Sequence, residues 1–576
     1  MPTLRWFVAL EDPALAREVA ALRGHLAAAG FADGGHALDH RPGSGPGDGA
    51  VVVWADQPLP PTVADALIGL GVPLLLCGPT LERADAEGQL ASAAGLDVGT
   101  ATGVHDVRVR PATSSTGAAG ATRATEAIGA IGTGSLLGPR DHASSGSAHL
   151  GEHTHVTDRV LRIEKTADDV EVLLTAKLGL VEHPVLTWRP ATRVAAWTLG
   201  TRPGVVSTRA VGRTLVMALR HLTGLPAPAP VRVGLLGYGA IGHEHNRAVQ
   251  HVPGLELAAV CDVSPDRVAA ARRYAPDARG YGDGEELVAD DQVDLVIVST
   301  PPSSHASWAL ACLNAGKHVI VEKPFAIRSS EADAVLDLAR ANGKVAAVYQ
   351  NRRFDPDHRA VRRALDAGLL GDLFHVEAFV GGYGHPCNLW HSDAQVSGGA
   401  FYDWGAHVLD QLLDLLPGPI EHVTAAEHKR VWLDVTNADH SRVTIRFSTG
   451  AEATFVYSDL AAALKPRWYV LGTQGAVVGN WRTERVISRS DIGTLAEDVL
   501  APGDSPPILD LHGPDGSVTR LATPPAPPYA FHAELADQLR FGLTPTITGA
   551  QSRRVLAVME AATQSAREGG RPVVPR

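Results

Sequence analysis

The sequence predicts an α/β protein with three folded parts. The first is an α/β domain of the flavodoxin type, the second an α/β domain with a parallel sheet, and the third an α+β domain with an open, mostly antiparallel sheet. Two observations predict the first two parts: short apolar runs alternate with helix-like stretches before residue 222 and again after residue 231. A third observation predicts the last part, because strand-like runs follow one another closely after residue 373.

The N-terminal third alternates between apolar strand-like runs and helix-like stretches. Its predicted strands are residues 4–10, 50–54, 72–77, 170–176 and 195–198. Its predicted helices are residues 13–29, 62–69 and 207–222. A flavodoxin-like sheet covered by helices is the arrangement that this alternation favours.

The second part repeats the alternation at the spacing of βαβ units. Its predicted strands are residues 231–237, 256–262, 293–300, 318–321 and 345–349. Its predicted helices are residues 241–252, 265–275, 305–315 and 330–342. This spacing implies a parallel sheet covered on both faces. In the third part, residues 442–447, 452–457 and 467–472 are the strand-like runs that indicate an antiparallel sheet.

Composition marks the domain boundaries. A Pro/Ala run at residues 222–230 cannot continue a helix and is expected to form a semi-rigid linker. We therefore expect domains at residues 1–222, 231–355 and 356–576, joined at the first boundary by a linker at 223–230. The Ser/Thr/Gly/Ala-rich stretch 111–153 and the Pro/Gly/Asp-rich stretch 502–528 are expected to be long surface loops.

Bulk properties exclude several classes of function. The 576 residues are 45% hydrophobic and 20% charged, which is typical of a soluble globular protein. A net charge of −12 argues against a nucleic-acid partner, because no basic excess exists to neutralise phosphates. The sequence shows neither a signal peptide nor an apolar stretch of ~20 residues, so we expect a cytoplasmic protein without a membrane partner. The four cysteines are widely spread and are expected to be reduced thiols, mostly buried.

A glycine-rich turn follows the first strand of the second part and opens a helix. Its residues are Gly237, Tyr238, Gly239, Ala240, Ile241 and Gly242. In this motif the first Gly permits a tight turn, the second lets the backbone approach a pyrophosphate, and the third lets helix and strand pack closely. The helix N-terminus then offers free N–H groups to the phosphates. The strand before it, the helix after it and a later acidic residue make this a Rossmann dinucleotide-binding motif.

The acidic residue is Asp262, at the end of the next predicted strand. A carboxylate there accepts hydrogen bonds from the adenosine ribose hydroxyls and repels a 2′-phosphate, so NAD is favoured and NADP is not excluded. The alternative is that Asp262 is only a strand-end acid or a turn former.

Several separate motifs after residue 231 resemble, in order, those of the Gfo/Idh/MocA oxidoreductase family. They are Glu322-Lys323-Pro324, the segment from Val298 to His305, the segment from Asn351 to Phe354, the segment from Ser397 to Asp410, and Gly472-Thr473-Gln474-Gly475. The resemblance implies a Rossmann domain followed by an α+β domain, and a homo-oligomer paired through the exposed face of the C-terminal sheet. It also implies further cofactor-binding residues: Thr300, Pro301, Pro302, His305, Glu322, Lys323 and Asn351.

The same resemblance implies three catalytic residues. His407 would be the acid/base, Asp403 would orient it or hold a substrate hydroxyl, and Lys323 would stabilise a developing alkoxide. The i, i+4 spacing of Asp403 and His407 places both on one face if the segment is helical. Taken singly, each has a simpler interpretation, because a Lys before Pro is usually a surface charge and an Asp/His pair is often only a helix-face contact.

The loop before this segment interleaves aromatic and polar residues. Tyr383, His385 and Trp390 lie in it, and Trp404 follows Asp403, so these four are candidate substrate-binding residues. The alternative for Trp390 is a core position in an ordinary loop. No metal site is predicted, because Cys387 and His391 form a pair without a third ligand.

The N-terminal third loosely resembles ThuA-like proteins of trehalose utilisation, which share the class I glutamine-amidotransferase fold. The resemblance lies in the segments 155–161, 183–185 and 193–199. Amidotransferase activity is not predicted, because Cys77 lacks the preceding Gly that a nucleophile elbow requires. A degenerate, structural or substrate-binding domain is favoured over a second enzyme.

Three functions remain open at this point. The first is an NAD(P)-dependent dehydrogenase acting on a secondary hydroxyl of a sugar, glycoside or polyol, with a 3-keto sugar as one product that the resemblance suggests. The second is a redox-neutral glycosidase that oxidises its substrate transiently, eliminates the aglycone and returns the hydride. The third is a non-catalytic regulator that binds NAD or a sugar.

Overall fold

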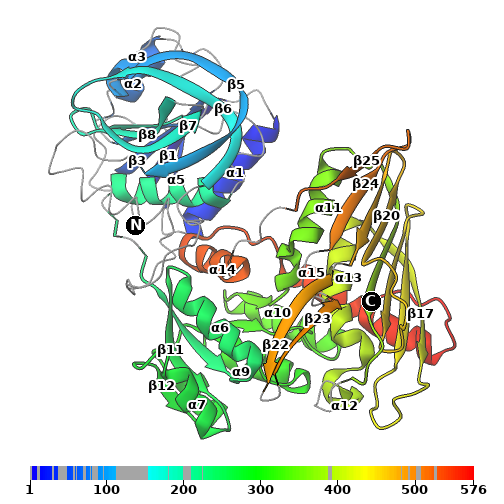
Figure 1. The fold of residues 1–576 in the computed structure, drawn as a ribbon. Helices are drawn as coiled ribbons and strands as arrows, with labels where there is room; N and C mark the ends of the chain where they lie inside the picture. Colours follow the sequence, from blue (N-terminus) through cyan, green and yellow to red (C-terminus); the bar gives the residue numbers. More distant parts are fainter. Residues whose placement is uncertain are drawn as a thin grey trace. The chain divides into compact units, whose positions relative to one another are not determined.

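The computed structural model forms two compact units (Figure 1). The first comprises Met1–Val231 with Gln250–Leu255 and Ala533–Pro545, and the second comprises Arg232–Val249, Glu256–His532 and Thr546–Arg576. The residues that the structure describes are 3–9, 13–28, 32–36, 48–55, 59, 61–68, 70, 73–77, 80, 89–94, 96–111, 154–178, 181–198, 209–223, 225–226, 228–386, 392–481, 483–490, 493–500, 507–523 and 528–576.

The first unit is built on a nine-stranded sheet with the order β2-β1-β3-β4-β9-β8-β7-β5-β6. The first five strands of this order are parallel. If these five are numbered among themselves along the chain, so that β9 is the fifth, their order is 2-1-3-4-5, which is that of flavodoxin-like folds. They are β1 (Thr3–Ala9), β2 (Ala32–His36), β3 (Asp48–Ala55), β4 (Leu74–Cys77) and β9 (Val194–Trp197). The antiparallel extension consists of β5 (Leu96–Pro111), β6 (Thr154–Thr166), β7 (Glu171–Leu178) and β8 (Val181–Arg189). The predicted fold class is confirmed.

Helices cover both faces of the parallel part of this sheet, and β3, the central strand of that part, shows why. Along β3, Val52 and Trp54 belong to one apolar core, while Val51 and Val53 belong to another. A strand buried on both faces reads as a continuous apolar run, as this one does. The helices of the unit are α1 (Pro13–Ala28), α2 (Pro61–Ile68), α3 (Gln89–Ala94) and α5 (Arg209–Leu222).

A segment from far along the chain completes the first unit. Most of α14 (Ala530–Phe541) belongs to it, and Phe541 and Leu543 are buried in the core that contains α5. The Arg209 guanidinium lies 3.1 Å from the Glu534 carboxylate. This pairing of distant segments was not predicted from the sequence.

The second unit begins with a parallel six-stranded sheet of order β12-β11-β10-β13-β14-β15, which is the Rossmann order 3-2-1-4-5-6. Its strands are β10 (Val231–Leu236), β11 (Leu255–Cys261), β12 (Arg279–Tyr281), β13 (Leu295–Val298), β14 (His318–Val321) and β15 (Ala346–Val348). Its helices are α6 (Ala240–His251), α7 (Pro265–Arg272), α8 (Gly284–Ala289), α9 (His305–Asn314) and α10 (Ser329–Ala341). The predicted strands and helices of this part are present, and β12 and α8 are additional.

The C-terminal sheet has eight strands in the order β17-β18-β19-β16-β20-β21-β24-β25. They are β16 (Leu373–Gly381), β17 (Ile420–His428), β18 (His440–Phe447), β19 (Glu452–Ser458), β20 (Trp468–Gly472), β21 (Ala476–Asn480), β24 (Ile508–His512) and β25 (Val518–Arg520). Neighbouring strands of this sheet pair antiparallel, except β16 with β19, which are parallel. A separate hairpin is formed by β22 (Thr483–Ser490) and β23 (Gly493–Leu500).

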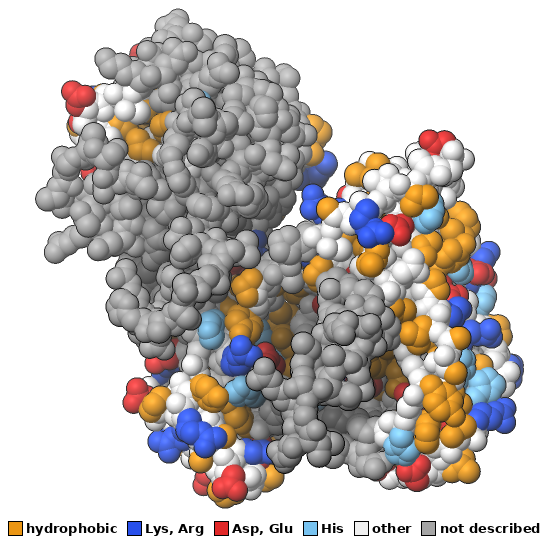
Figure 2. All heavy atoms as spheres, in the orientation of Figure 1, with side chains coloured by type: hydrophobic (Ala, Val, Ile, Leu, Met, Phe, Trp, Pro, Cys, Tyr) orange, Lys and Arg blue, Asp and Glu red, His pale blue; other side chains and the backbone are white. Residues whose placement is uncertain are grey.

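Two helices, α13 (Trp404–Leu415) and α15 (Gly549–Arg567), cover one face of this sheet. On β18, Val443 and Ile445 are buried against them, whereas Arg442 and Thr444 lie on the opposite, open face. Figure 2 shows hydrophobic side chains mixed with basic and histidine side chains over this part of the second unit.

One expected loop is partly a pair of strands. Within residues 502–528, β24 and β25 extend the sheet, because Leu509 is fully buried in the core and pairs in register with Gly479 of β21. The expected loop at 111–153 lies, from residue 112 on, outside the described residues. Cys77, Cys261 and Cys312 are free and buried, whereas Cys387 lies outside the described residues. Among the helices that the structure describes, none is long and apolar enough to cross a membrane.

Candidate active site

The glycine-rich turn has the geometry that a dinucleotide phosphate site needs. Gly237 has φ +94°, and a Cβ added to it would lie 2.7 Å from the carbonyl oxygen of Ser299. A Cβ on Gly242 would lie 2.6 Å from the carbonyl oxygen of Gly237, so the helix packs tightly on the turn. A Cβ on Gly239 would meet nothing within 4 Å, which leaves its backbone open to a ligand. These three environments match the three roles of the motif, and the residues fit an NAD(P) pyrophosphate.

Asp262 follows β11 directly and is tied to the turn. Its Oδ2 accepts a hydrogen bond of 2.8 Å from the backbone N–H of Tyr238, and its Oδ1 accepts one of 2.9 Å from Ser264. The Arg267 guanidinium lies 3.6 Å from Oδ2. Asp262 therefore holds the turn in place, in addition to the ribose contact expected from the sequence. A carboxylate has about four lone-pair sites, so these bonds leave capacity for a cofactor hydroxyl.

The loop after β13 is fastened by a buried histidine. His305, the first residue of α9, places Nδ1 2.8 Å from the carbonyl oxygen of Pro324 and Nε2 2.7 Å from that of Thr300. Pro301 and Pro302 lie in the loop that this ring closes, where a 3₁₀ turn spans Pro302–Ser304. Burial lowers the pKa of His305. The ring thus joins two loops at the carboxyl edge of the sheet.

A cavity of about 260 Å³ lies at this edge and brings together all three predicted catalytic residues and part of the predicted cofactor set. The predicted residues that line it are Ile241, Thr300, Pro302, His305, Glu322, Lys323, Asn351, Asp403 and His407. It is also lined by residues that the sequence interpretation missed: Ser299, Pro324, Tyr349, Arg352, Ser397 and Tyr402. All six lie within or close to the sequence motifs of the second unit. Their position in or near a motif could therefore have marked them as site residues. Gly237, Tyr238, Gly239, Ala240, Gly242, Asp262 and Pro301 do not line this cavity.

Lys323 and Asp403 form an ion pair at the cavity. Lys323 Nζ donates a hydrogen bond of 2.6 Å to Asp403 Oδ1, and the two side chains are 20% and 42% exposed. Asp403 is the N-cap residue of α13, after a 3₁₀ turn at Ala400–Tyr402, and is not inside the helix. The expectation that both residues lie within a helix is therefore wrong for Asp403. Asp403 caps the helix, and His407 lies near the start of the helix. Both still line the same cavity.

His407 is a buried imidazole in a positively charged environment. Burial, followed by the charges of Lys323, Arg352 and Arg467, lowers its pKa well below the ordinary value. Its Nδ1 is buried and has no hydrogen-bond partner among the residues described. The ring is therefore neutral at physiological pH and has the capacity to take up a proton.

Glu322 connects the cavity to two buried histidines. Its Oε2 accepts a hydrogen bond of 3.0 Å from the backbone N–H of Lys323, and its Oε1 lies 3.0 Å from His245 Nε2. His245 Nδ1 in turn lies 2.9 Å from His532 Nε2. Glu322 was predicted as a cofactor-binding residue, whereas no local sequence pattern marks His532, which lies far along the chain.

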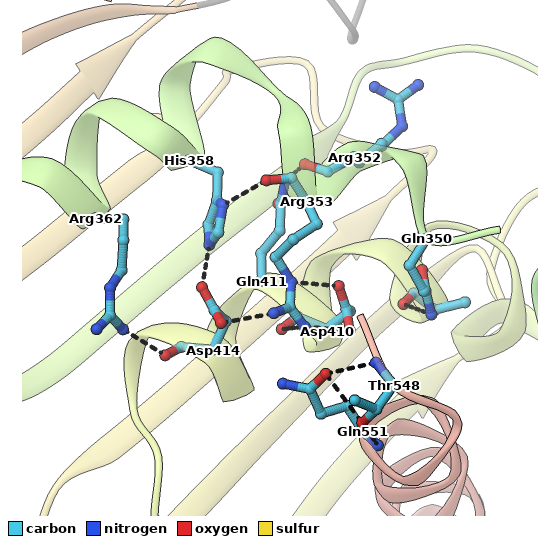
Figure 3. Close-up of polar contacts among 11 residues, drawn as sticks. Gln350, Arg352, Arg353, His358, Arg362, Asp410, Gln411, Asp414, Thr548 and Gln551 are labelled. Carbon is cyan, nitrogen blue, oxygen red and sulfur yellow. Dashed lines mark hydrogen bonds and ion pairs between the residues drawn. The ribbon is translucent and has the colours of Figure 1, made fainter. Parts of the chain in front are cut away.

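A buried ionic cluster fixes the helix that carries His407 (Figure 3). Arg353 donates hydrogen bonds of 2.8 and 2.6 Å to Asp410 and one of 2.6 Å to Asp414, both on α13. His358 Nε2 lies 3.2 Å from Asp414. Gln350 Nε2 also donates to the carbonyl oxygen of Ala406, the residue before His407. The orientation of His407 therefore depends on contacts made by residues 350–358.

Three of the four candidate substrate-binding residues lie outside the first cavity. Tyr383, His385 and Trp404 line a second, open groove of about 330 Å³, and Trp390 lies outside the described residues. The Arg352 guanidinium lies 4.6 Å from the centre of the Trp404 ring. Among the residues that the structure describes, no group of three or more His, Cys, Asp or Glu side chains could hold a metal ion.

Comparison with known proteins identifies the matching region. Residues 231–350 match the model of an oxidoreductase family with an NAD-binding Rossmann fold, and residues 358–478 match the GFO/IDH/MocA C-terminal domain. Scyllo-inositol 2-dehydrogenase (NADP(+)) of Bacillus subtilis is 26% identical over 349 residues, which cover 59% of this chain and 94% of that protein. Inositol 2-dehydrogenase of Salmonella typhimurium is 35% identical over 149 residues, covering 25% of this chain and 44% of that protein.

The solved structure of an NAD-binding protein from Listeria innocua is similar to the same region, with a TM-score of 0.51 and 27% identity over 60% of this chain and 96% of that one. The fold, the phosphate-binding turn and these matches define an NAD(P)-dependent oxidoreductase. Residues 231–350 and 358–478 therefore match the two domains of the Gfo/Idh/MocA family.

Proposed function

We propose that this oxidoreductase transfers a hydride between NAD(P) and a secondary hydroxyl carbon of a sugar, glycoside or polyol. The observation that carries the proposal is the cavity that an ammonium (Lys323), a carboxylate (Asp403) and a neutral imidazole (His407) share with the cofactor-binding loops. Two relatives are named as inositol dehydrogenases, which supports a polyhydroxylated ring as substrate.

The cofactor would be held by the turn at residues 237–242, by Asp262 and by the loop fastened by His305. When bound, its nicotinamide ring supplies the hydride acceptor. We expect NAD to be the preferred form because Asp262 is acidic, although a B. subtilis relative is named for NADP(+).

The roles of the three side chains follow from their charge states. His407 accepts the hydroxyl proton while the carbon gives its hydride to the oxidised cofactor, so the alcohol becomes a ketone. The Lys323 ammonium stabilises the negative charge that develops on the reacting oxygen. Asp403, paired with Lys323 at 2.6 Å, positions the ammonium, and we assign it the additional role of holding a substrate hydroxyl.

The test is reduction of NAD⁺ by the purified protein with a panel of polyols, sugars and glycosides. We expect NADH formation, and a fall in kcat of ~10²–10⁴-fold in His407→Asn, which removes a general base. Release of an aglycone without net NADH would instead indicate the redox-neutral glycosidase. Binding of NAD and sugar without any turnover would indicate the regulator and overturn the proposal.

We also propose that the N-terminal unit is a non-catalytic domain of the ThuA-like type. Cys77 supports this, because its thiol is buried, donates to the carbonyl oxygen of Leu75 and has a pKa raised well above the ordinary value by burial. We expect Cys77 to resist alkylation by iodoacetamide in the native protein and to react after unfolding. Rapid alkylation of the native thiol would contradict the proposal.

A further inference from the structure

The second groove lies at the carboxyl end of β16 and just beyond β19. Gly382, Tyr383 and Gly384 form one side of it, and Tyr457 and Asp459 form another. Its volume of about 330 Å³ is no smaller than that of the reaction cavity. Nothing in the proposed reaction uses these residues.

The groove adjoins the reaction cavity through Trp404. Trp404 lines the groove and directly follows Asp403, which lines the cavity. Its ring is also stacked with the guanidinium of Arg352, a second cavity residue, at 4.6 Å. The walls of the groove and of the cavity are therefore in direct contact.

The groove combines an aromatic surface with a hydrogen-bond acceptor. The Tyr383 side chain is 62% exposed, and its ring meets the Trp432 ring edge-on, with centroids 6.2 Å apart. Asp459 Oδ1 accepts a hydrogen bond of 2.8 Å from the Tyr457 hydroxyl. Within the described part of the chain, no hydrogen bond to its other carboxylate oxygen is found. Aromatic rings pack against the C–H faces of sugars, and carboxylates accept hydrogen bonds from sugar hydroxyls.

We propose that this groove binds the second ring of a glycoside whose first ring is oxidised in the adjoining cavity. The inference rests on the proposed function and narrows its substrate class to glycosides and disaccharides, in preference to free monosaccharides and cyclitols. Tyr383 supplies the surface on which the second ring stacks, and Asp459 accepts a hydrogen bond from one of its hydroxyls.

Two glycines keep the groove open. A Cβ built on Gly382 or Gly384 would meet nothing within 4 Å, and neither residue has a positive φ. Packing therefore does not require glycine at these positions, and a side chain placed there would occupy the groove. Gly382→Phe is a variant that fills the proposed subsite without straining the backbone.

The experiment compares kcat/KM for NAD⁺ reduction with cellobiose and maltose against glucose and myo-inositol. We expect at least one disaccharide to be preferred over both single-ring compounds. Asp459→Asn, Tyr383→Ala and Gly382→Phe should each lower kcat/KM for that disaccharide ~10–100-fold, because a hydrogen bond to a charged group contributes about that factor. The values for glucose and myo-inositol should stay within about twofold. Phe374→Ala, an exposed aromatic at the opposite end of β16, is the matched control and should change neither.

Disaccharide binding to the NAD-loaded protein, measured by calorimetry, separates failure of the inference from failure of the proposed function. Binding that is lost in Gly382→Phe, with no NADH formed by any substrate, supports the groove and rejects the oxidation. Equal kcat/KM for single-ring and double-ring substrates, or an equal loss for both in the three variants, rejects the groove and leaves the oxidation in place.

Discussion

Burial, together with nearby positive charges, lowers the pKa of His407 and so determines the pH range in which it acts as a base. Burial comes first among the causes of its lowered pKa, and Lys323, Arg352 and Arg467 add to it. A base works only when unprotonated, so alcohol oxidation should be lost as pH falls through this lowered pKa. The acid limb of the kcat profile is therefore expected below pH 6.5, the ordinary value for histidine.

Arg352→Met tests this assignment. The variant removes one of the cations that disfavour the imidazolium, so the pKa of His407 rises and the acid limb of kcat moves to higher pH. Arg352→Lys keeps the charge and serves as the control, with its limb expected to stay near that of the native protein. The kcat profile is measured from pH 4.5 to 8. An acid limb that does not move in Arg352→Met would mean that a group other than His407 titrates there.

Asp262 accepts hydrogen bonds from the backbone of the turn, and we expect it to influence the choice of cofactor as well. In Asp262→Ala the amides of Tyr238 and Ser264 lose their acceptor. A ribose hydroxyl loses one as well. We expect kcat/KM for NAD⁺ to fall ~10–150-fold, the factor for hydrogen bonds to a charged group. The ratio of NADP⁺ to NAD⁺ use should rise, because the repelling charge is gone and the Arg267 guanidinium remains.

Arg267→Ala is the companion variant. It removes the cation that lies 3.6 Å from Asp262 and should weaken the use of NADP⁺ more than that of NAD⁺. Steady-state kinetics with both cofactors measures the two ratios. A parallel loss for both cofactors in Asp262→Ala would mean that the residue acts only on the turn.

The single residues that sequence patterns predicted best are those with a fixed place in a motif. Lys323, Asp403 and His407 line one cavity, as their motifs indicated. His532 could not be predicted, because its contact with His245 joins positions 287 residues apart and no local pattern marks it. Tyr383 and Trp404 line a neighbouring groove, since a loop pattern does not say which cavity its side chains face.

At the scale of elements, the 3₁₀ turn at Asn351–Phe354 and helix α13 are held together by charges that are almost fully buried. The Arg353 and Asp410 side chains are 4% and 1% exposed, and their nearest atoms are 2.6 Å apart. Arg353→Met leaves the Asp410 carboxylate buried without its partner, so we expect a loss of about 3–5 kcal/mol in the free energy of unfolding. Denaturant unfolding followed by tryptophan fluorescence measures this loss.

Two further variants decide whether the charge pair is the cause. Asp410→Asn added to Arg353→Met should recover part of the stability, because the uncompensated charge is removed. Arg340→Ala breaks an exposed pair with Asp337 and should change the unfolding free energy by less than about 1 kcal/mol. Equal losses in Arg340→Ala and Arg353→Met would contradict the role of burial.

Elements with strong local patterns were predicted from the sequence, and their partners were not. The strands and helices of the Rossmann sheet follow their apolar periodicity closely. Helix α14 also has apolar residues at helical spacing. That spacing does not indicate that Phe541 packs in the core of the first unit. The strands β24 and β25 were missed because Pro and Gly surround two short runs, and their pairing with β21 decides the structure.

At the scale of the whole molecule, the open face of the C-terminal sheet is the surface on which we expect a second copy of the chain. Tyr469 of β20 is 41% exposed there and pairs across strands with Glu377 and Val478. Arg442 and Thr444 of β18 lie on the same face. Tyr469 and Arg442 are exposed on this face, so its side chains are available to a second copy related by symmetry.

Light scattering coupled to size-exclusion chromatography tests this expectation. The native chain should have the mass of a dimer or tetramer. Tyr469→Glu should shift it toward the monomer, because symmetry places the new charge at the same interface in every copy. Tyr274→Glu, which adds a charge to an exposed tyrosine of the Rossmann domain, is the control and should leave the mass unchanged. A native chain that is monomeric at all concentrations would show that this face stays solvated, and the mixed polar character of Arg442 and Thr444 would then explain why.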